Sequence, residues 1–393
     1  MISRKISRAC RWLSALGAGL ALLLASGAPI AQDSGLNLRA AWVTRWALRS
    51  AEDVKALLAR LDEVGVNTVF FQVRGAADAF YRSSYEPWSD LLTGTLGEDP
   101  GWDPLRIAVR EGHRLGMEVH AWVNVFTAFQ TTDSGNPPPL SDPIHPMLAH
   151  PDWVARNKSG TPMPILKSAT VDNYAFFSPT KREVQDHVKH VINEIVGKYR
   201  VDGIHLDYVR FPDSSYSYDT ESRVAYLKAE LREGLSFAQW RTRELSRFVG
   251  EIGRSVEMVR PGTAVSAAVW QVVDAGRTSY YQDGVDWMRR GYVDFVVPMI
   301  YSVSVSSFED RLKVYADSVG ASNVVAGIGA YLEGFDGAVL VGQLEAASAL
   351  RAGGIAVFNS DYALTYGDVL RFYFGGGEAS DSGVNPGIDP GGQ

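Results

Sequence analysis

Residues 201–212 carry the residue types and spacing that most clearly suggest chemistry. The stretch has the pattern of a short strand, in which alternate side chains point to opposite faces. His205 and Asp207 therefore share one face with Gly203, while the other face is apolar. A histidine and a carboxylate on one face of a buried strand suit a site that opens where the strand ends. Asp207 is the residue that we expect to carry the function.

Eight apolar, β-branched or aromatic runs that could form such strands alternate with helical segments. The predicted strands are residues 38–45, 67–74, 118–125, 201–209, 264–270, 293–301, 323–331 and 354–359. Continuous apolar strands that alternate with amphipathic helices predict a parallel sheet covered by helices. Eight such units favour an α/β fold, a closed (β/α)8 TIM barrel over residues 36–374. An open doubly wound sheet is the alternative, although no glycine-rich phosphate loop follows the first strand.

The segments between the strands have helix signals and two long connections. Ser50 with Asp53 resembles a capping box, and Gly65 is placed to stop the helix that follows. The long connections are residues 126–178 after the third strand and 212–236 after the fourth. Long connections at the C-terminal ends of barrel strands usually build the substrate site.

Polar and aromatic residues gather at the C-terminal strand ends, where barrel enzymes place their chemistry. Those that we expect to hold a substrate are Arg74, His120, Asn124, His205, Arg210, Trp270 and Tyr301. Planar polar groups and aromatic rings around one opening suit a sugar, whose hydroxyl groups take hydrogen bonds and whose C–H faces pack on rings. The site pattern therefore predicts a carbohydrate ligand.

Glycoside cleavage needs two carboxyl groups. One attacks or stabilises the oxocarbenium-like centre, and the other protonates the leaving oxygen. Asp207 fits the first role, as nucleophile or cation stabiliser. Asp361 is our first candidate for the acid, with Asp274 and then Glu333 behind it.

Each of these residues also has a structural alternative. A strand-end aspartate can cap a loop or pair with an arginine, and Arg74 could be the counter-ion that keeps Asp207 ionised. His120 could be a hydrogen-bonded core histidine, and Trp270 could serve packing alone.

Composition limits the partners. The chain has 393 residues, 46% of them hydrophobic, enough for a large core. Its net charge of −7 disfavours nucleic acid and anionic membrane surfaces. The single cysteine, Cys10, excludes a disulfide framework and a cysteine metal site. We expect no cofactor, no metal, and a polysaccharide or peptidoglycan glycan strand as partner; the sequence leaves the oligomeric state open.

Residues 1–31 have the pattern of a secretory signal peptide. A basic region precedes an apolar run and small residues: Arg4, Lys5, Arg8, Arg11, Ala28 and Ala31. A membrane anchor is the alternative, but the apolar run is shorter than the ~20 residues that a span needs. Because no cysteine lies at the cleavage site, we expect a soluble periplasmic or secreted protein without a transmembrane segment. Residues 375–393 are predicted to form a disordered tail.

Several separate motifs, in order along the chain, resemble one known family. They are residues 39–43 (Arg-Ala-Ala-Trp-Val), 67–74 (Asn-Thr-Val-Phe-Phe-Gln-Val-Arg), 120–124 (His-Ala-Trp-Val-Asn), 150–154 (His-Pro-Asp-Trp-Val), 202–212, 297–301 and 327–331. Together they are similar to glycosyl-hydrolase-like family 10, formerly domain of unknown function 187. The resemblance spans residues 38–374.

This resemblance implies a (β/α)8 fold and relatives among retaining α-glycosidases, whose strand-four aspartate, here Asp207, is the nucleophile. One branch resembles divisome-localised glycosidases that cut peptidoglycan strands stripped of their peptides. Many relatives carry a second aspartate where this chain has Tyr208, and divisome-type relatives often carry a lipid-anchor cysteine that this chain lacks. The leading hypothesis is an exported glycoside hydrolase; the alternatives are a non-catalytic glycan-binding barrel and an exported α-glucan hydrolase.

Overall fold

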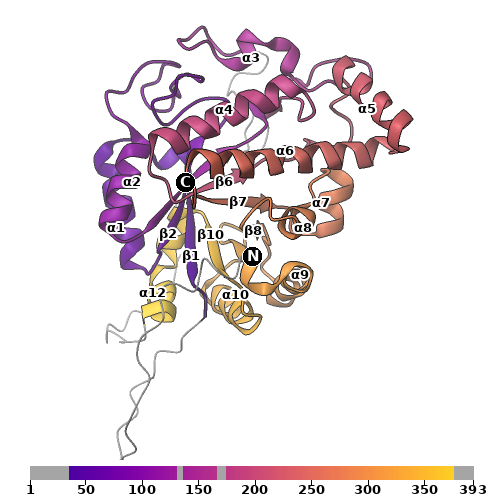
Figure 1. Ribbon diagram of the computed structural model, residues 1–393. Helices are drawn as coiled ribbons and strands as arrows, with labels where there is room; N and C mark the ends of the chain where they lie inside the picture. Colours follow the sequence, from indigo (N-terminus) through magenta and orange to yellow (C-terminus); the bar gives the residue numbers. More distant parts are fainter. Residues whose placement is uncertain (1–34, 131–135, 166–173, 376–393) are drawn as a thin grey trace, which may run out of the picture.

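The computed structural model describes residues 35–130, 136–165 and 174–375, which form a barrel of parallel strands surrounded by helices (Figure 1). The strands are β1 (Leu38–Val43), β2 (Thr68–Arg74), β3 (Glu118–Asn124), β6 (Gly203–Asp207), β7 (Ala264–Val269), β8 (Phe295–Pro298), β9 (Val325–Gly329) and β10 (Gly354–Phe358). They pair in the order β8-β7-β6-β3-β2-β1-β10-β9, and parallel bridges from Val296 to Val324 and from Met299 to Gly327 close the sheet. The predicted (β/α)8 barrel is confirmed, and the open sheet is excluded.

Alternate side chains of the strands fill the barrel interior. Its apolar cluster consists of Ala40, Trp42, Phe70, Trp122, Val297, Val325 and Ala356. The opposite strand faces join a larger core beneath the helices. The interior is close-packed: a Cβ at Gly203 would overlap the His120 ring. In such a barrel only the last residues of the strands can present side chains to a ligand.

Helices follow the strands largely as the sequence predicts. Ser50 caps α1 (Ala51–Glu63), and its Oγ accepts the N–H of Asp53 at 3.1 Å. The other long helices of the ring are α2 (Pro104–Arg114), α4 (Arg182–Lys198), α6 (Phe237–Val259), α9 (Val305–Val319) and α10 (Gly337–Ala349). Shorter ones are α8 (Gly284–Arg289), α11 (Ser360–Thr365) and α12 (Gly367–Gly375). In Figure 1, α4 and α6 run side by side over one flank of the barrel.

Three connections at the C-terminal strand ends are long. Residues 125–181 contain α3 (Pro146–Ala149), the 3₁₀ helix η3 (Pro151–Trp153) and the antiparallel pair of β4 (Thr127–Phe129) and β5 (Ala175–Phe176). Residues 208–236 contain α5 (Thr220–Glu233), although the sequence predicted a loop there. Its Val224, Leu227 and Leu231 are exposed, so the helix has little apolar stripe facing the core that periodicity could reveal. The third connection, residues 75–103, was not predicted to be long.

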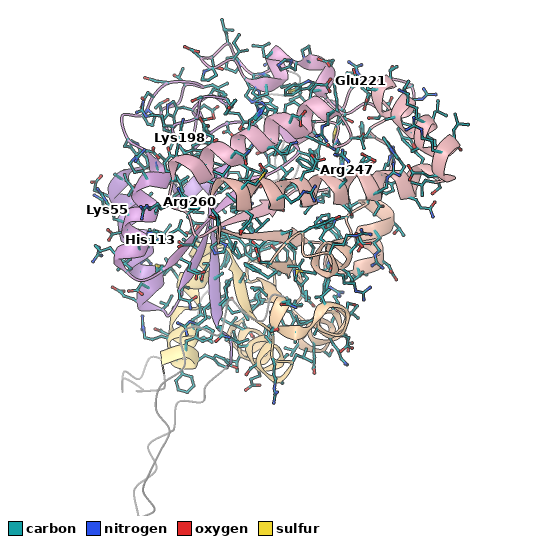
Figure 2. The ribbon with its side chains drawn as sticks, viewed as in Figure 1. Lys55, His113, Lys198, Glu221, Arg247 and Arg260 are labelled. Carbon is teal, nitrogen blue, oxygen red and sulfur yellow. The ribbon has the colours of Figure 1, made fainter. Side chains whose placement is uncertain are left out.

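Ion pairs lie on the surfaces of the outer helices. Figure 2 labels Lys198, whose ammonium lies 2.6 Å from Glu194, and Arg247, whose Nε lies 3.0 Å from Glu244. Both pairs are partly solvent-exposed, and such pairs contribute ~0–1 kcal/mol each. The two apolar cores therefore stabilise the barrel more than its surface charges do.

Two sequence predictions fall largely on residues outside the described ranges. The signal peptide at residues 1–31 lies outside them, as does the predicted tail except for Gly375, which ends α12. Within residues 35–130, 136–165 and 174–375, no helix has the length and apolar character needed to cross a bilayer.

Candidate active site

Asp207 is the last residue of β6, at the barrel face formed by the C-terminal strand ends. The side chain is nearly buried, and both carboxylate oxygens are oriented. Trp122 Nε1 donates to Oδ2 at 3.2 Å, and the N–H of Tyr208 donates to Oδ1 at 2.7 Å. Tyr208 has a φ of 48°, which is uncommon for a bulky residue, and this turn brings its N–H back to the carboxylate. A carboxylate fixed in this way suits attack on, or stabilisation of, one defined atom.

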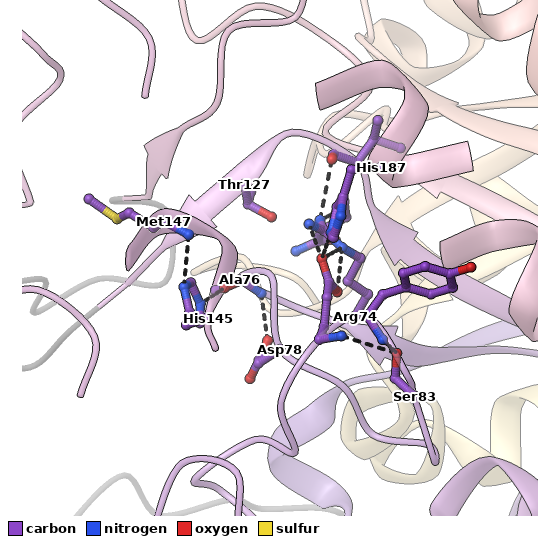
Figure 3. A network of polar contacts seen from close by, with 12 residues as sticks. Arg74, Ala76, Asp78, Ser83, Thr127, His145, Met147 and His187 are labelled. Atoms are coloured by element: carbon purple, nitrogen blue, oxygen red, sulfur yellow. Dashed lines mark hydrogen bonds and ion pairs between the residues drawn. The ribbon is translucent and has the colours of Figure 1, made fainter. Parts of the chain in front are cut away.

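The strand ends of β1, β2, β3 and β6 form what we call the polar side, with Arg45, Arg74, Asn124 and Asp207 as its polar residues. Arg74 and Glu86 form a fully buried ion pair, 2.8 Å between Nη2 and Oε1. His187 Nε2 also donates to Glu86 Oε1 at 2.9 Å (Figure 3). Burial alone would raise the pKa of Glu86, but Arg74 and His187 outweigh it and lower the pKa to about 2.

The pairing of Arg74 differs from the predicted one. Its Nη1 donates to the backbone carbonyls of Asn124 and Val125, and its counter-ion is Glu86. Arg74 therefore fixes the end of β3 rather than reaching a ligand, and the role of counter-ion to Asp207 is not supported by this contact. Its predicted sugar contact is not supported either, because Glu86 and the two backbone carbonyls already pair with its guanidinium.

A tight turn after β2 supports the polar side. Asp78 Oδ1 accepts the N–H groups of Ala76 at 2.7 Å and Gly75 at 3.3 Å. His145 Nε2 donates to the Ala76 carbonyl at 3.0 Å (Figure 3). Burial lowers the pKa of His145, so the ring holds this contact as a neutral group. The turn is thus fixed from residues 75–103 and from residues 125–181 together.

Asn124 lies beside Asp207, since the two residues are register partners on β3 and β6. Its Nδ2 donates to the Gly75 carbonyl at 3.1 Å. Its Oδ1 is buried and has no hydrogen-bond partner in the described part of the chain. An unpaired buried acceptor is costly, so this oxygen is well suited to a hydroxyl or N–H group of a ligand.

Arg210 and Trp270 meet where the polar side ends. The Arg210 guanidinium carbon lies 4.7 Å from the Tyr208 ring centroid, 5.1 Å from that of Tyr280 and 5.6 Å from that of Trp270. Gln282 fixes Trp270 by accepting its backbone N–H at 2.8 Å. The structure therefore brings these two predicted sugar contacts together, next to the residue that follows Asp207.

The strand ends of β7, β8, β9 and β10 form the aromatic side, with Trp270, Tyr301, Tyr331 and Phe358. The Tyr301 ring lies 5.7 Å from Tyr331 and 5.8 Å from Phe358, centroid to centroid. Gly329 permits this packing, because a Cβ there would lie 2.7 Å from Tyr301 Cβ. Tyr331 is 44% exposed. The aromatic side thus presents ring faces of the kind that sugars stack on.

His120 and His205 share the inward face with Asn124 and Asp207 but lie deeper. His120 pairs in register with Gly203 at the start of β6, and its Nε2 donates to Glu118 at 3.3 Å. At ~3.3 Å per residue it lies ~13 Å below Asn124. Its predicted sugar contact is therefore not supported.

His205 is a neutral core residue. The Trp42 indole N–H, a donor only, donates to His205 Nε2 at 3.1 Å, so the ring proton lies on Nδ1 and is donated to Ser266 Oγ at 2.9 Å. The ring also stacks on Phe70 at 4.0 Å. Burial lowers its pKa well below the ordinary value. Both nitrogens are occupied, so its predicted sugar contact is not supported.

The predicted acids are on the surface. Asp361 lies in the first turn of α11 and Asp274 in the first turn of α7 (Val273–Ser279), and both side chains are exposed. Glu333, exposed as well, follows β9. All three stand at strand ends of the aromatic side, where the sequence placed them. Among the described residues, no group of three histidine, cysteine or acidic side chains could hold a metal ion.

Sequence reasoning missed Arg45 and Glu86. Arg45 ends the first predicted strand, residues 38–45, and lies two positions after the end of β1, so its position at a strand end was a usable signal. Glu86 has no such signal, because only the path of residues 75–103 brings it to Arg74. Asp90, in the same connection, is exposed as a residue, although desolvation of its carboxyl group and the neighbouring Asp78 raise its pKa.

Two of the curated relatives are named glycosyl hydrolases. Glycosyl hydrolase DigH of Escherichia coli (strain K12) is 29% identical over 299 residues, covering 69% of this chain and 64% of that protein. Glycosyl hydrolase YngK of Bacillus subtilis (strain 168) is 28% identical over 296 residues, covering 68% and 55%. This chain therefore spans less than two thirds of the length of either relative.

Solved structures show the same fold. The PgaB (BpsB) glycoside hydrolase domain from Bordetella bronchiseptica aligns with a TM-score of 0.64 and 14% identity, covering 86% of this chain and 98% of that one. The catalytic domain of β-amylase from Paenibacillus polymyxa aligns with a TM-score of 0.59 and 11% identity, covering 87% and 99%. At such identities the likeness concerns the fold alone.

The family match covers most of the barrel. The model of the family glycosyl hydrolase-like 10 matches residues 37–332, from β1 to just beyond β9. This chain belongs to the glycosyl hydrolase-like 10 family.

Proposed function

We propose that this protein is an exported glycoside hydrolase that cleaves a bacterial cell-wall glycan, peptide-stripped peptidoglycan above all, or a related polysaccharide. The observation that carries the proposal is the placement of Asp207. It ends the fourth barrel strand with both oxygens held, by Trp122 and by the N–H of Tyr208. In this role Asp207 is the nucleophile or cation stabiliser at the anomeric carbon.

The two sides of the strand-end face divide the work of binding. On the polar side, Asn124 Oδ1 and the Arg210 guanidinium receive polar groups of the sugar. On the aromatic side, Tyr301 and Trp270 provide ring faces. Binding that spans both sides holds the anomeric carbon over Asp207, and such positioning is a large part of catalysis.

A general acid must supply the second carboxyl group. Asp361 remains our first candidate and Asp274 the second, on α11 and α7. Asparagine substitution at each position separates them: the acid's variant loses cleavage of substrates with poor leaving groups far more than of substrates with activated ones.

Digestion assays read by mass spectrometry test the proposal. The protein and its Asp207→Asn variant are each incubated with peptide-stripped peptidoglycan, intact peptidoglycan and α-glucans. The proposal predicts fragments from the stripped glycan with the unaltered protein only. Fragments from α-glucans alone would keep the mechanism and reject the wall substrate.

A non-catalytic glycan-binding barrel is the second candidate function. The observation that favours it is the position of Asp361 and Asp274 on exposed first turns of short helices, which leaves the acid unassigned. Sedimentation of the protein with wall glycan, without products from any substrate in the assay above, would establish this function and exclude the hydrolase.

A further inference from the structure

Arg45 is a buried cation that forms no ion pair with any described residue. The residue begins the 3₁₀ helix η2 (Arg45–Ala47), two positions after the end of β1, and is only 5% exposed. Its Nη2 donates to Gln130 Oε1 at 2.7 Å, a neutral acceptor. Its Nε and Nη1 are buried and have no hydrogen-bond partner in the part of the chain that the structure describes. Burying a charge without an ion pair is costly, so such a group calls for an explanation.

The contrast with Arg74 shows that this fold can satisfy a buried guanidinium. Arg74, on the neighbouring strand, pairs with Glu86 and donates to two backbone carbonyls. Arg45 receives no such set of acceptors. The Arg45 charge acts on the carboxyl group of Asp90, where it opposes the rise in pKa, but the two side chains form no ion pair among the described residues. Asp78 Oδ1 is already occupied by the N–H groups of Gly75 and Ala76.

The Arg45 side chain is nevertheless held firmly in place. Its backbone N–H donates to Gln72 Oε1 at 3.0 Å. Its guanidinium carbon lies 4.6 Å from the Trp46 ring centroid and 5.5 Å from that of Tyr174. The guanidinium packs against Gly75, where any Cβ would collide with it. The structure thus keeps a fixed guanidinium that forms no ion pair within the described residues.

The place of Arg45 links it to the proposed active site. The Tyr174 ring that contacts it lies 5.3 Å from the Tyr208 ring, and Tyr208 follows Asp207. Gly75, against which it packs, also accepts the side-chain N–H of Asn124 through its carbonyl. Arg45 therefore belongs to the polar side.

We infer that Arg45 receives a carboxylate of the sugar substrate, so that the site selects acidic saccharides. This inference rests on the proposed function and gives its substrate class. Guanidinium groups recognise carboxylates through charge-assisted hydrogen bonds, and Arg45 has N–H groups left for them. Because the guanidinium is almost enclosed, it selects a small protruding anion. Trp46, 38% exposed, offers a ring face beside it for the sugar that carries this anion.

Peptide-stripped peptidoglycan has this chemistry. Its muramic acid residues carry a lactyl ether that ends in a carboxylate. In intact peptidoglycan the same carboxyl group is an amide to the stem peptide and has no charge. A guanidinium at this place therefore distinguishes stripped from intact strands, and neutral glucans offer it nothing.

A matched pair of substrates tests the inference. Soluble oligosaccharides of peptide-stripped glycan are compared with the same oligosaccharides after chemical reduction of the lactyl carboxyl group to an alcohol. Charge-assisted hydrogen bonds predict that the protein prefers the carboxylated form in kcat/KM by roughly 10- to 100-fold. In Arg45→Gln this ratio is expected to fall to about 1, and Arg45→Lys is expected to lie between the two.

Arg39→Gln is the control, because Arg39 lies at the other end of β1, with its Nε donating to the Gly65 carbonyl at 2.7 Å. Its ratio should equal that of the unaltered protein. An oligouronide, whose carboxylates are part of the sugar unit itself, tests whether the lactyl group is required. If the protein also prefers the oligouronide over its reduced form, the subsite accepts uronic acids as well as muramic acid. Equal kcat/KM for carboxylated and reduced glycan with the unaltered protein would overturn the inference and leave the hydrolase standing.

Calorimetric binding of both oligosaccharides separates the two hypotheses. These titrations use the Asp207→Asn protein with and without Arg45→Gln, and therefore do not depend on turnover. One outcome would reject the proposed function and support the carboxylate subsite. In it, the unaltered protein cleaves neither glycan, but Asp207→Asn binds the carboxylated glycan more tightly than the reduced one. That preference is then lost when Arg45→Gln is added. Should Arg45→Gln not fold, Arg45→Lys serves in both assays, and an undiminished preference there would count against Arg45.

Discussion

The polar side and the aromatic side of the strand-end face are built in different ways. On the polar side, Arg74 and Glu86 form a buried ion pair, whereas Arg45 is enclosed and forms no ion pair in the described part of the chain. On the aromatic side, the rings of Tyr301 and Tyr331 contact each other, and the connections that follow β8 and β9 are short. The polar side depends on residues 75–103 and 125–181 to position its charges.

This difference bears on how such a site is assembled. Buried charges need partners from distant loops, and each lost partner leaves an uncompensated group. Aromatic rings need only neighbours of suitable shape, such as Gly329 beneath Tyr301. Single substitutions on the polar side should therefore cause large losses of activity or stability, and those on the aromatic side small losses.

The largest effect is expected at Asp207. Asp207→Asn removes the negative charge while keeping the hydrogen bonds from Trp122 and Tyr208, so kcat should fall by ~10⁴-fold on a glycan substrate. The rate is measured from reducing ends released. Asp202→Asn is the control: Asp202 precedes the same strand at the opposite end of the barrel. Full activity of Asp207→Asn would contradict the assignment.

Removal of Glu86 should destabilise the polar side. Glu86→Gln leaves Arg74 buried without a counter-ion, which costs about 3–5 kcal/mol of unfolding free energy. Urea denaturation measures this loss. Asp317→Asn, which breaks an exposed pair with Lys313, should change stability by at most ~1 kcal/mol. Equal stabilities for the two variants would show that the buried pair does not support this side.

The same pair should make stability depend on pH. Folding lowers the pKa of Glu86 from 4.5 to about 2. A depressed carboxyl pKa contributes stability above the unfolded pKa, so the contribution, about 3 kcal/mol, is present above pH 4.5 and is lost as pH falls toward 2. The stability difference between the unaltered protein and Glu86→Gln should therefore shrink over this window. A difference independent of pH would refute the ionised form of Glu86.

The smallest effect is expected on the aromatic side. Tyr331→Ala removes one exposed ring, and KM for a glycan should rise ~2- to 10-fold with kcat nearly unchanged. Phe372→Ala, at an exposed ring on α12, is the control and should leave KM unchanged. A loss in kcat as large as that of Asp207→Asn would abolish the contrast between the two sides.

The sequence predicted the barrel well because buried parallel strands are continuous apolar runs. Each predicted strand contains an observed one, and Asp207 does end β6. The depth of each side chain within the barrel was harder to predict. Side-chain alternation placed His120 and His205 on the inward face, but a shared face does not give a shared height, and both lie inside the barrel.

Pairing across loops could not be predicted at all. Arg74 was expected near Asp207, yet Glu86 reaches it through a connection that has no helical or strand periodicity. The enclosure of Arg45 depends on Gly75, from the same connection as Glu86, and on Tyr174, from residues 125–181. No local pattern in the sequence predicts such contacts between distant residues.

A crystal structure of Asp207→Asn with an oligosaccharide of peptide-stripped glycan tests the central claim most directly. We predict a sugar ring between the two sides, with its anomeric carbon ~3–3.5 Å from the side chain of residue 207. The lactyl carboxylate of that or a neighbouring sugar should lie at the Arg45 guanidinium. An oligosaccharide bound away from residue 207, on the outer helices or at the other end of the barrel, would contradict the account.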